Sequence, residues 1–332
     1  MKKYINPAVR IILFIVIFAL IIHVMNFCLV VSNWASIDRW EAYASDDGYD
    51  TLFVGSSVGW VIVPRTIDAM NDCKCVNMST PDQFYRTSAD AVKFVSSQQP
   101  LQKVVLLTGF DALSQSEDYA AAASFLDAKY ETAPLAKRYG AIISDKLGRY
   151  KDIDFLTSVE SMNIWVDWVL RFSYTLPQVY KNIAYRRGRI DPGYVLDMEK
   201  KIERIDPPKA DKSLLDEDIA KAGELGSAGI NVDPDSLGML DEMASFLSAN
   251  GIGFTVIVTP HRSDVRAGYG EGYGVIDSYL KEFVEKRGGQ YFNLDNDESL
   301  RERLPDDMFM DHEHIVDEGN NLVSGKIAEL LR

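Results

Sequence analysis

The stretch Asp50-Thr51-Leu52-Phe53-Val54-Gly55-Ser56-Ser57 is an apolar run that ends in a glycine and two serines. A short run without polar interruption is typical of a strand that is buried on both faces of a parallel sheet. Glycine and serine directly after such a run are typical of a tight turn. We therefore predict a strand over Thr51–Gly55 that ends abruptly at this turn.

Four more short apolar runs repeat this pattern and predict strands at Cys75–Met78, Lys103–Thr108, Phe254–Thr259 and Gln290–Leu294. Helical patterns separate or follow them, at Pro81–Ser97, Pro234–Asn250, Val275–Lys286 and Glu318–Leu331. Buried strands that alternate with helices indicate a parallel sheet with helices on both faces. The predicted fold class is α/β, a doubly wound parallel sheet in a three-layer α/β/α arrangement.

A long insertion, helical in pattern, separates the third predicted strand from the fourth over residues 115–230. We expect it to belong to one large domain over residues 48–332. Within the insertion, Trp165–Arg189 combines aromatic and basic residues, and two interpretations stay open. The segment is either a packed helix in the core of the insertion, or a cap or contact face, because Trp and Tyr beside Arg suit an interface.

The most apolar part of the chain is N-terminal: basic residues precede residues 11–31, a run broken only by His23 and Asn26. As a helix, this run is about 31 Å long, enough to cross a hydrocarbon core of about 30 Å. Positive charge before the run and acidic residues after it place the N-terminus in the cytoplasm. We therefore expect residues 1–34 to form a cytoplasmic tip and a single-pass transmembrane anchor in the cell membrane, with the large domain extracytoplasmic.

The charge balance and the cysteines exclude some classes of protein. With 49 acidic and 35 basic residues, the net charge is −14, which argues against a nucleic-acid partner because phosphates require clustered Lys and Arg. Cys73 and Cys75 are the only cysteines outside the N-terminal run. Two thiolates alone do not complete a structural zinc site, so we interpret both residues as buried small apolar side chains.

The Gly-Ser-Ser turn lies at the carboxyl end of a predicted parallel strand, where such sheets bind ligands. A serine hydroxyl is a weak nucleophile until a base accepts its proton, and histidine is the natural base. Of the four histidines, His23 falls in the predicted anchor, which leaves His261, His312 and His314. The alternative interpretation of the serines is a turn or a helix cap without chemistry.

Asp311 and His314 lie three residues apart just before the last predicted helix. On a tight turn, this spacing lets the carboxylate hold the imidazole Nδ1–H while Nε2 faces a serine. We therefore predict a catalytic site of Ser57, His314 and Asp311. A capping role is the alternative, and the neighbouring His and carboxylate side chains also permit a metal site. Because no second ligand pair at helical spacing is present, we predict no metal and no other cofactor.

At residues 54–57, Val-Gly-Ser-Ser resembles the first block of the SGNH (GDSL-like) hydrolase superfamily, with Ser57 at the place of the nucleophile. The pattern Asp311-x-x-His314, followed by Gly319, resembles its last block, and residues 76–81 and 104–111 resemble the second and third. The likeness is to the DltD-like and alginate-acetylation-like extracytoplasmic branch, over about residues 48–112 and 252–330. It implies an SGNH-like fold with Ser-His-Asp chemistry.

The resemblance usually includes a glycine in the second block and an asparagine in the third as oxyanion donors, and this sequence has neither at the matching positions. The expected substitutes are the backbone N–H groups of Ser57, Ser79 and Thr80 and the side chain of Asn77. Donors in such places typically lower a barrier by about 3–4 kcal/mol. As pocket candidates we name Ser56, Gly109, Asp111 and His261, although a solvated loop histidine remains the alternative for His261.

Together these motifs predict a membrane-anchored serine-dependent O-acyltransferase that acts on a cell-envelope polysaccharide. The resemblance implies a multi-span membrane acyltransferase as a partner, and tethering would raise its local concentration. Two alternatives stay open. One is an extracytoplasmic esterase that hydrolyses acyl esters, and the other is a non-catalytic envelope protein that retains the fold.

Overall fold

The computed structural model covers one N-terminal helix and most of the predicted α/β domain. The described residues are 6–29, 34–60, 62–81, 83–115, 125–126, 128–129, 140, 144, 212–228, 232–309, 311, 313–316 and 318–332. The chain divides into two compact units, Met1–Trp34 with Tyr130–Tyr194 and Ala35–Lys129 with Val195–Arg332. The segment Trp165–Arg189 lies outside the described residues, so both interpretations of it stay predictions.

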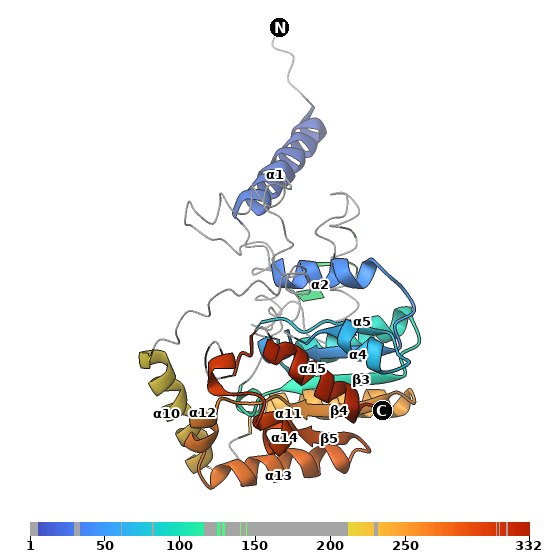
Figure 1. Cartoon of the computed structure of the whole chain (residues 1–332). Helices are drawn as coiled ribbons and strands as arrows, with labels where there is room; N and C mark the ends of the chain where they lie inside the picture. The colour runs from blue at the N-terminus through green and yellow to red at the C-terminus, as the bar shows by residue number, and fades with distance from the viewer. Residues whose placement is uncertain are drawn as a thin grey trace. The chain divides into compact units, whose positions relative to one another are not determined.

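A five-stranded sheet forms the centre of the second unit (Figure 1). Its strand order is β2-β1-β3-β4-β5, and every neighbouring pair is parallel. The strands are β1 at Thr51–Gly55, β2 at Cys75–Asn77, β3 at Lys103–Thr108, β4 at Gly253–Val258 and β5 at Gln290–Asn293. The five predicted strands are thus confirmed to within one residue at each end. The chain order reverses between β1 and β3, which makes their carboxyl ends a topological switch point.

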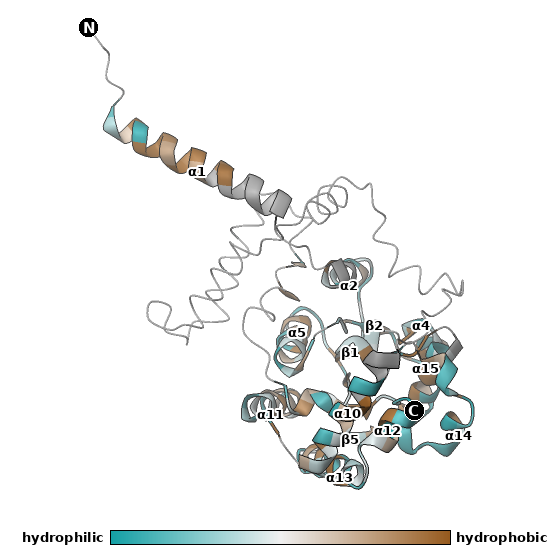
Figure 2. Cartoon of the chain, turned by 90° about the vertical axis from the view of Figure 1, so that its left-hand side faces the viewer, coloured by the Kyte–Doolittle hydropathy of each residue, from teal (hydrophilic) through white to brown (hydrophobic). Residues whose placement is uncertain are grey.

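Helices cover both faces of this sheet, consistent with the predicted three-layer α/β/α arrangement (Figure 2). On one face, α5 (Tyr85–Gln98) packs against α11 (Pro234–Ala249), and the two contact β1 and β4. On the other face, α4 (Pro64–Met70) packs against α15 (Glu318–Leu330). Beside β5 lies α13 (Gly272–Glu285). Besides α1, the other described elements are α2 (Trp34–Ala44), α3 (Ser57–Trp60), α10 (Lys212–Ala228), α12 (Ser263–Gly268), α14 (Glu298–Arg301), η1 (Asp111–Leu113), η4 (Leu294–Asn296) and η5 (Asp306–Met308).

The central strand β1 is apolar from Leu52 to Gly55 because both faces of the sheet are buried there. Successive side chains of a strand point to opposite faces, so Phe53 of β1 joins one core cluster with Ile67 of α4 and Ile327 of α15. Leu52 and Val54, on either side of Phe53, are also fully buried. The positions after Thr51 are therefore occupied by apolar side chains and glycine, which explains the uninterrupted run over residues 52–55.

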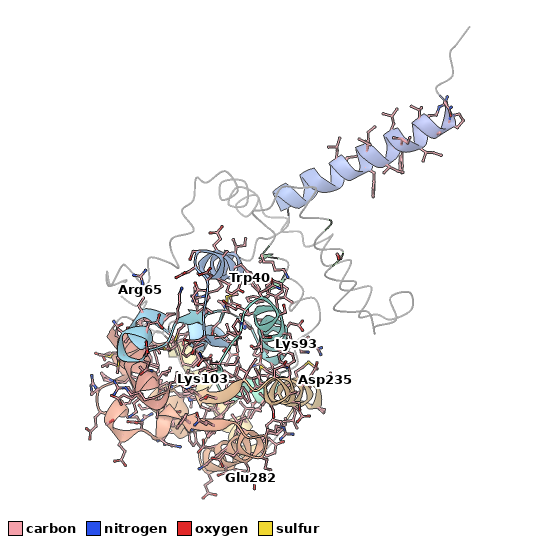
Figure 3. The ribbon with its side chains drawn as sticks, turned by 90° about the vertical axis from the view of Figure 1, so that its right-hand side faces the viewer. Trp40, Arg65, Lys93, Lys103, Asp235 and Glu282 are labelled. Atoms are coloured by element: carbon pink, nitrogen blue, oxygen red, sulfur yellow. The ribbon has the colours of Figure 1, made fainter. Side chains whose placement is uncertain are left out.

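The short helix α2, which the sequence analysis did not predict, joins the second unit through an aromatic cluster. Trp40 is buried, and its indole N–H donates to the carbonyl of Phe125 at 2.8 Å. Its ring also meets Phe94 of α5 edge to face, with 5.3 Å between the centroids. Figure 3 labels Trp40 at this junction.

A glycine is required where β1 ends. Gly55 has a φ of +147°, a conformation that side chains with a Cβ rarely adopt. A Cβ at this position would also collide with the carbonyl oxygen of Leu107 on β3. Gly55 therefore permits both the close approach to β3 and the abrupt turn into Ser56 and Ser57.

In the first unit, α1 spans Pro7–Leu29, and hydropathy colouring shows its described part to be mainly apolar (Figure 2). Large apolar side chains between Val9 and Ile21 are exposed. Among the residues that the structure describes, no helix meets the combined requirement of length and apolarity for a membrane span.

Candidate active site

Ser57 opens α3, a single helical turn that begins just after β1. Its side chain is half-buried, and its hydroxyl forms no hydrogen bond with any described residue. The neighbouring strands β1 and β3 enclose the switch point, and parallel α/β sheets bind ligands there. The topology therefore places Ser57 at the crevice where ligand chemistry is expected.

Asp311 and His314 form a closely bonded pair, as their spacing in the sequence predicts. The imidazole Nδ1 lies 2.9 and 2.7 Å from the two carboxylate oxygens of Asp311. The backbone N–H groups of Glu313 and His314 donate to the same carboxylate at 3.0 and 2.9 Å. These bonds hold the imidazole ring with Nδ1 toward Asp311, the orientation that a carboxylate gives to a histidine base.

The electrostatics of this pair favour an ionised carboxylate. Burial alone would raise the pKa of Asp311, but the hydrogen bonds from the His314 ring and from the two backbone N–H groups lower it to about 2. Asp311 therefore stays negative at every physiological pH and stabilises a positive charge on His314. An imidazole base needs this support when it accepts a proton.

Asp311 should make the stability of the protein depend on pH. Because the folded pKa of about 2 lies below the ordinary value of 3.8, the unfolded chain takes up this proton at a higher pH than the native protein does. The contribution is complete above the ordinary pKa and disappears as the pH falls through the folded value. We expect urea titrations of wild type and Asp311→Asn to differ most near neutral pH and to converge toward pH of about 2. An equal difference at all pH values would contradict this assignment.

The loop that carries His314 is closed and lies against the end of β3. A bridge between Phe309 and Ile315, with a 2.9 Å bond from the Val316 N–H to the Met308 carbonyl, joins its two sides. A Cβ on Gly109 would lie 3.1 Å from the Glu313 carboxylate, so this loop contacts the backbone just after β3. The loop therefore belongs to the carboxyl edge of the sheet.

The two halves of the predicted site thus follow neighbouring strands. Gly55 of β1 pairs with Leu107 of β3, and Ser57 and Gly109 each lie two residues beyond that pair. Neighbouring strands are about 4.8 Å apart, so the Ser57 turn and the backbone that the His314 loop contacts follow adjacent strand ends. The structure contains no hydrogen bond between the Ser57 hydroxyl and His314. Such bonds are often long before substrate binds.

The predicted oxyanion donors have other partners. The Asn77 amide donates to the carbonyls of Gly59 and Ile62 at 2.9 and 3.2 Å. The Ser79 N–H donates to Asn77 Oδ1 at 3.0 Å, and the Thr80 N–H donates to the Gly55 carbonyl at 3.2 Å.

These bonds hold β2 and its following turn against α3, so these groups are not open donors in this structure. The expectation that Ser79, Thr80 and Asn77 supply the oxyanion hole needs correction, because each donor is already used to build the fold. Of the donors named from the sequence, only the backbone N–H of Ser57 has no described partner.

A cavity of about 540 Å³ opens beside the His314 loop. Its lining includes two pocket candidates from the sequence, Asp111 and His261, together with Glu313, Tyr269 of the turn after α12 and Lys221 of α10. Gly109 lies next to it, since a Cβ there would be 2.7 Å from Asp111 Oδ1. Ser56 remains beside Ser57 in the turn after β1.

A second histidine–aspartate pair forms one wall of this cavity. His261 is 3% exposed, and its Nδ1 lies 2.6 Å from the fully buried carboxylate of Asp295. Asp295 also accepts hydrogen bonds from the backbone N–H of His261 at 2.9 Å, from the Tyr273 hydroxyl at 3.0 Å and from the Arg301 guanidinium at 2.9 Å. His261 Nε2 has no partner among the described residues and is not sealed from solvent. His261 is therefore a held, pocket-lining residue rather than a solvated loop histidine.

The charge state of His261 follows from its neighbours. Burial lowers the pKa of His261, but the bond to Asp295 and the negative charges of Asp295, Glu313 and Asp111 outweigh burial and raise the pKa above its ordinary value. A raised pKa makes Nε2 a better proton acceptor when it is neutral and a hydrogen-bond donor when it is charged. Both properties suit contact with a polar ligand in the cavity.

Asp295 was not named from the sequence. It follows β5 directly, in Asn293-Leu294-Asp295, so its position after a strand was an available signal. Its partner His261 lies 34 residues earlier, after β4. Only the pairing of β4 with β5 brings these two strand ends together.

No metal cluster is found at this edge among the described residues, although His312 lies outside them. Within those residues, the single group with suitable geometry contains Asp68, Cys73 and Cys75. The fold and the site define the second unit as a doubly wound parallel α/β domain with a serine turn and two histidine–aspartate pairs along its carboxyl edge. No protein-family model matches this chain, and no curated protein matches it either.

Proposed function

We propose that this protein is an SGNH-like serine O-acyltransferase or esterase whose catalytic residues are Ser57, His314 and Asp311. The observation that carries the proposal is the bonded Asp311–His314 pair, in a loop against the end of β3, the strand that pairs with β1 and therefore neighbours the strand that ends at the Gly-Ser-Ser turn. A carboxylate that orients an imidazole beside an unbonded serine is the arrangement that nucleophilic acyl transfer needs.

The proposed reaction has two halves. In the first, Ser57 Oγ attacks the acyl carbonyl carbon while His314 Nε2 accepts its proton, and the same proton then passes to the departing alcohol as the ester bond breaks. In the second, an acceptor hydroxyl or water gives its proton to His314 and attacks the acyl-serine, and the proton returns to Ser57. The N–H of Ser57 is the donor available for the oxyanion, which one donor typically stabilises by about 3–4 kcal/mol.

The cavity reaches the His314 loop through Glu313 and is not lined by Ser57, Asp311 or His314, and its polar lining suits a hydroxyl-rich acceptor such as an envelope polysaccharide. Asp111 and Glu313 provide carboxylate acceptors for hydroxyl groups, and His261 adds a polar ring nitrogen that has no described partner. The carboxylates in the lining disfavour an anionic ligand by like-charge repulsion. Occupancy by such an acceptor would favour transfer, whereas an empty cavity would admit water and favour hydrolysis.

A fluorophosphonate probe tests the proposal directly. Incubated with the purified full-length protein in detergent, the probe is expected to label one serine, and peptide mass spectrometry should assign it to Ser57. Heat-unfolded protein and His314→Ala should label far more slowly, because the hydroxyl then lacks its base. Absence of labelling, or labelling at a different serine, would favour the non-catalytic envelope protein, an alternative supported by the occupied oxyanion donors.

We further propose that residues 1–34 anchor the protein in the cell membrane with the large domain outside, where a multi-span membrane acyltransferase could supply the acyl group. The apolar run over residues 11–31 and its flanking charges support this orientation. A C-terminal alkaline phosphatase fusion, active only outside the cytoplasm, is expected to be active. An inactive fusion, together with an active cytoplasmic reporter at the same position, would reverse the orientation.

A further inference from the structure

A second cluster of reactive side chains lies far along the strands from the proposed catalytic site. It comprises Asp68 of α4, Cys73 and Cys75, whose candidate ligand atoms all lie within 4.8 Å of one another. Cys75 begins β2 and pairs with Thr51, the first residue of β1, so the cluster marks the amino edge of the sheet. The Ser57 turn follows the opposite, carboxyl end of β1.

The distances in the cluster fit a tetrahedral thiolate site. Zinc–sulfur bonds are about 2.3 Å and zinc–oxygen bonds about 2.0 Å, so two thiolates on one ion lie about 3.8 Å apart and a thiolate and a carboxylate about 3.5 Å apart. The two sulfur atoms are 3.4 Å apart, and Cys73 Sγ is 3.8 Å from Asp68 Oδ1. Adjustments of a few tenths of an ångström would bring these two separations to the ideal values, and the third, between Cys75 Sγ and the Asp68 carboxylate, lies within 4.8 Å. We propose that Asp68, Cys73 and Cys75 bind one Zn²⁺ ion, with a water molecule as the fourth ligand.

The third ligand is already oriented. Asp68 Oδ1 accepts the Cys75 N–H at 2.9 Å, which fixes the carboxylate beside both sulfurs. Its second oxygen has no hydrogen bond with a described residue. A hydrogen bond that holds a metal-binding carboxylate in place is a common outer-shell feature of metal sites.

The donor types of the cluster suit a cation. Two sulfur atoms and one carboxylate oxygen are the kinds of ligand that bind zinc. A Zn²⁺ ion binds cysteine in the thiolate form. Binding would release two protons to solvent, one from each cysteine, without a change in oxidation state.

Solvent has a path to the cluster. A cleft of about 420 Å³ is lined by Cys73, together with Asp50 and Asp72 and with Lys103, which is labelled in Figure 3. The charges of Asp50 and Asp72 are balanced by those of Lys103 and Arg332, so the cleft provides access for an ion and the ligand set itself has to provide the affinity. The cleft also has room for the water that would complete the coordination.

Cobalt and zinc titrations test the proposal on the full-length protein, purified in detergent with a phosphine reductant. We expect one equivalent of Co²⁺ to produce a near-ultraviolet thiolate-to-cobalt band and tetrahedral visible bands, both lost when Zn²⁺ displaces it. Cys73→Ser and Cys75→Ser should abolish these bands, and Asp68→Asn should weaken binding while keeping the Cys75 N–H acceptor. Cys28→Ser, the same substitution at the remaining cysteine, is the matched control and should bind as wild type does.

Measurements on wild type keep the test decisive if the buried Cys75 variant does not fold. One equivalent of Zn²⁺ should slow alkylation of Cys73 by iodoacetamide and raise the midpoint of thermal unfolding, since the ion binds only the folded site. The proposal is overturned if wild type binds no Co²⁺ or Zn²⁺, if the bands survive in both cysteine variants, or if mass spectrometry finds a Cys73–Cys75 disulfide in protein purified without reductant. Because the site is remote from Ser57, Ser57→Ala should retain full binding.

Discussion

Ser57→Ala is expected to reduce acyl-ester turnover by a factor on the order of 10⁴ to 10⁶, the range observed when a hydrolase loses a catalytic nucleophile. The proposed reaction proceeds through an acyl-serine, so removal of Oγ leaves no atom to carry the acyl group. The folded state should change little, because the hydroxyl is half-buried and forms no hydrogen bond with a described residue. Stopped assays with a chromogenic acetyl ester, alongside circular dichroism, would measure both quantities.

The neighbouring serine provides the discriminating comparison. Ser56→Ala removes the same group one position earlier in the same turn. We expect this variant to retain far more activity than Ser57→Ala, since Ser57 opens α3 at the end of the turn. If Ser56→Ala were the inactive variant, the nucleophile would be Ser56. If both variants turned over ester at the wild-type rate, the serine mechanism would be wrong.

Asp295→Ala is expected to lower the free energy of unfolding by about 3–5 kcal/mol, the usual loss when one partner of a buried ion pair is removed. The Asp295 carboxylate is fully buried and accepts hydrogen bonds from His261, Tyr273 and Arg301. Its removal leaves these donors without their acceptor, and buried unpaired polar groups are costly. Chemical unfolding in urea at neutral pH, followed by tryptophan fluorescence, would measure the loss.

An exposed ion pair in the same unit supplies the control. Asp241 pairs with Arg287 near the surface, with the Asp241 side chain 51% exposed. Asp241→Ala should therefore cost at most about 1 kcal/mol. If Asp295→Ala does not fold, Asp295→Asn can replace it, because asparagine keeps the shape and some acceptor capacity. Its loss in free energy of unfolding should lie between those expected for Asp295→Ala and Asp241→Ala. A loss at Asp295 no larger than that at Asp241 would show that the buried network does not stabilise the fold.

The pattern of apolar and polar residues within each element was sufficient to predict most of the strands and the longer helices. The central strands show this most clearly: β3 has an apolar run from Val104 to Leu107, because a strand buried on both faces favours apolar side chains at successive positions. Helices with a clear apolar face, such as α5 and α13, were predicted for the same reason. The short helices α3 and α4 were not, since a few residues do not display a helical period.

The Asp311–His314 pair was also predictable, because its geometry depends on a three-residue turn and little else. The inferred position of Ser57 depended on one strand end and one glycine, both visible in the sequence. The closeness of these two loops required one further assumption, that parallel strands present their carboxyl ends at a common edge. The observed β1–β3 pairing supports that assumption.

The amino-acid sequence is therefore enough to predict the α/β class, the strands and the residue types at one edge of the sheet. Which of these polar groups form hydrogen bonds within the fold depends on the three-dimensional arrangement of the elements. It committed Asn77, Ser79 and Thr80 to bonds within the fold, paired His261 with Asp295, and placed Asp68 beside two cysteines that appeared too few for a metal. The physical reason is that the periodicity of apolar residues reflects burial along a single helix or strand. Hydrogen bonds and ligand sets, in contrast, join side chains from different elements, and the separation of two elements in the sequence does not predict their distance in space.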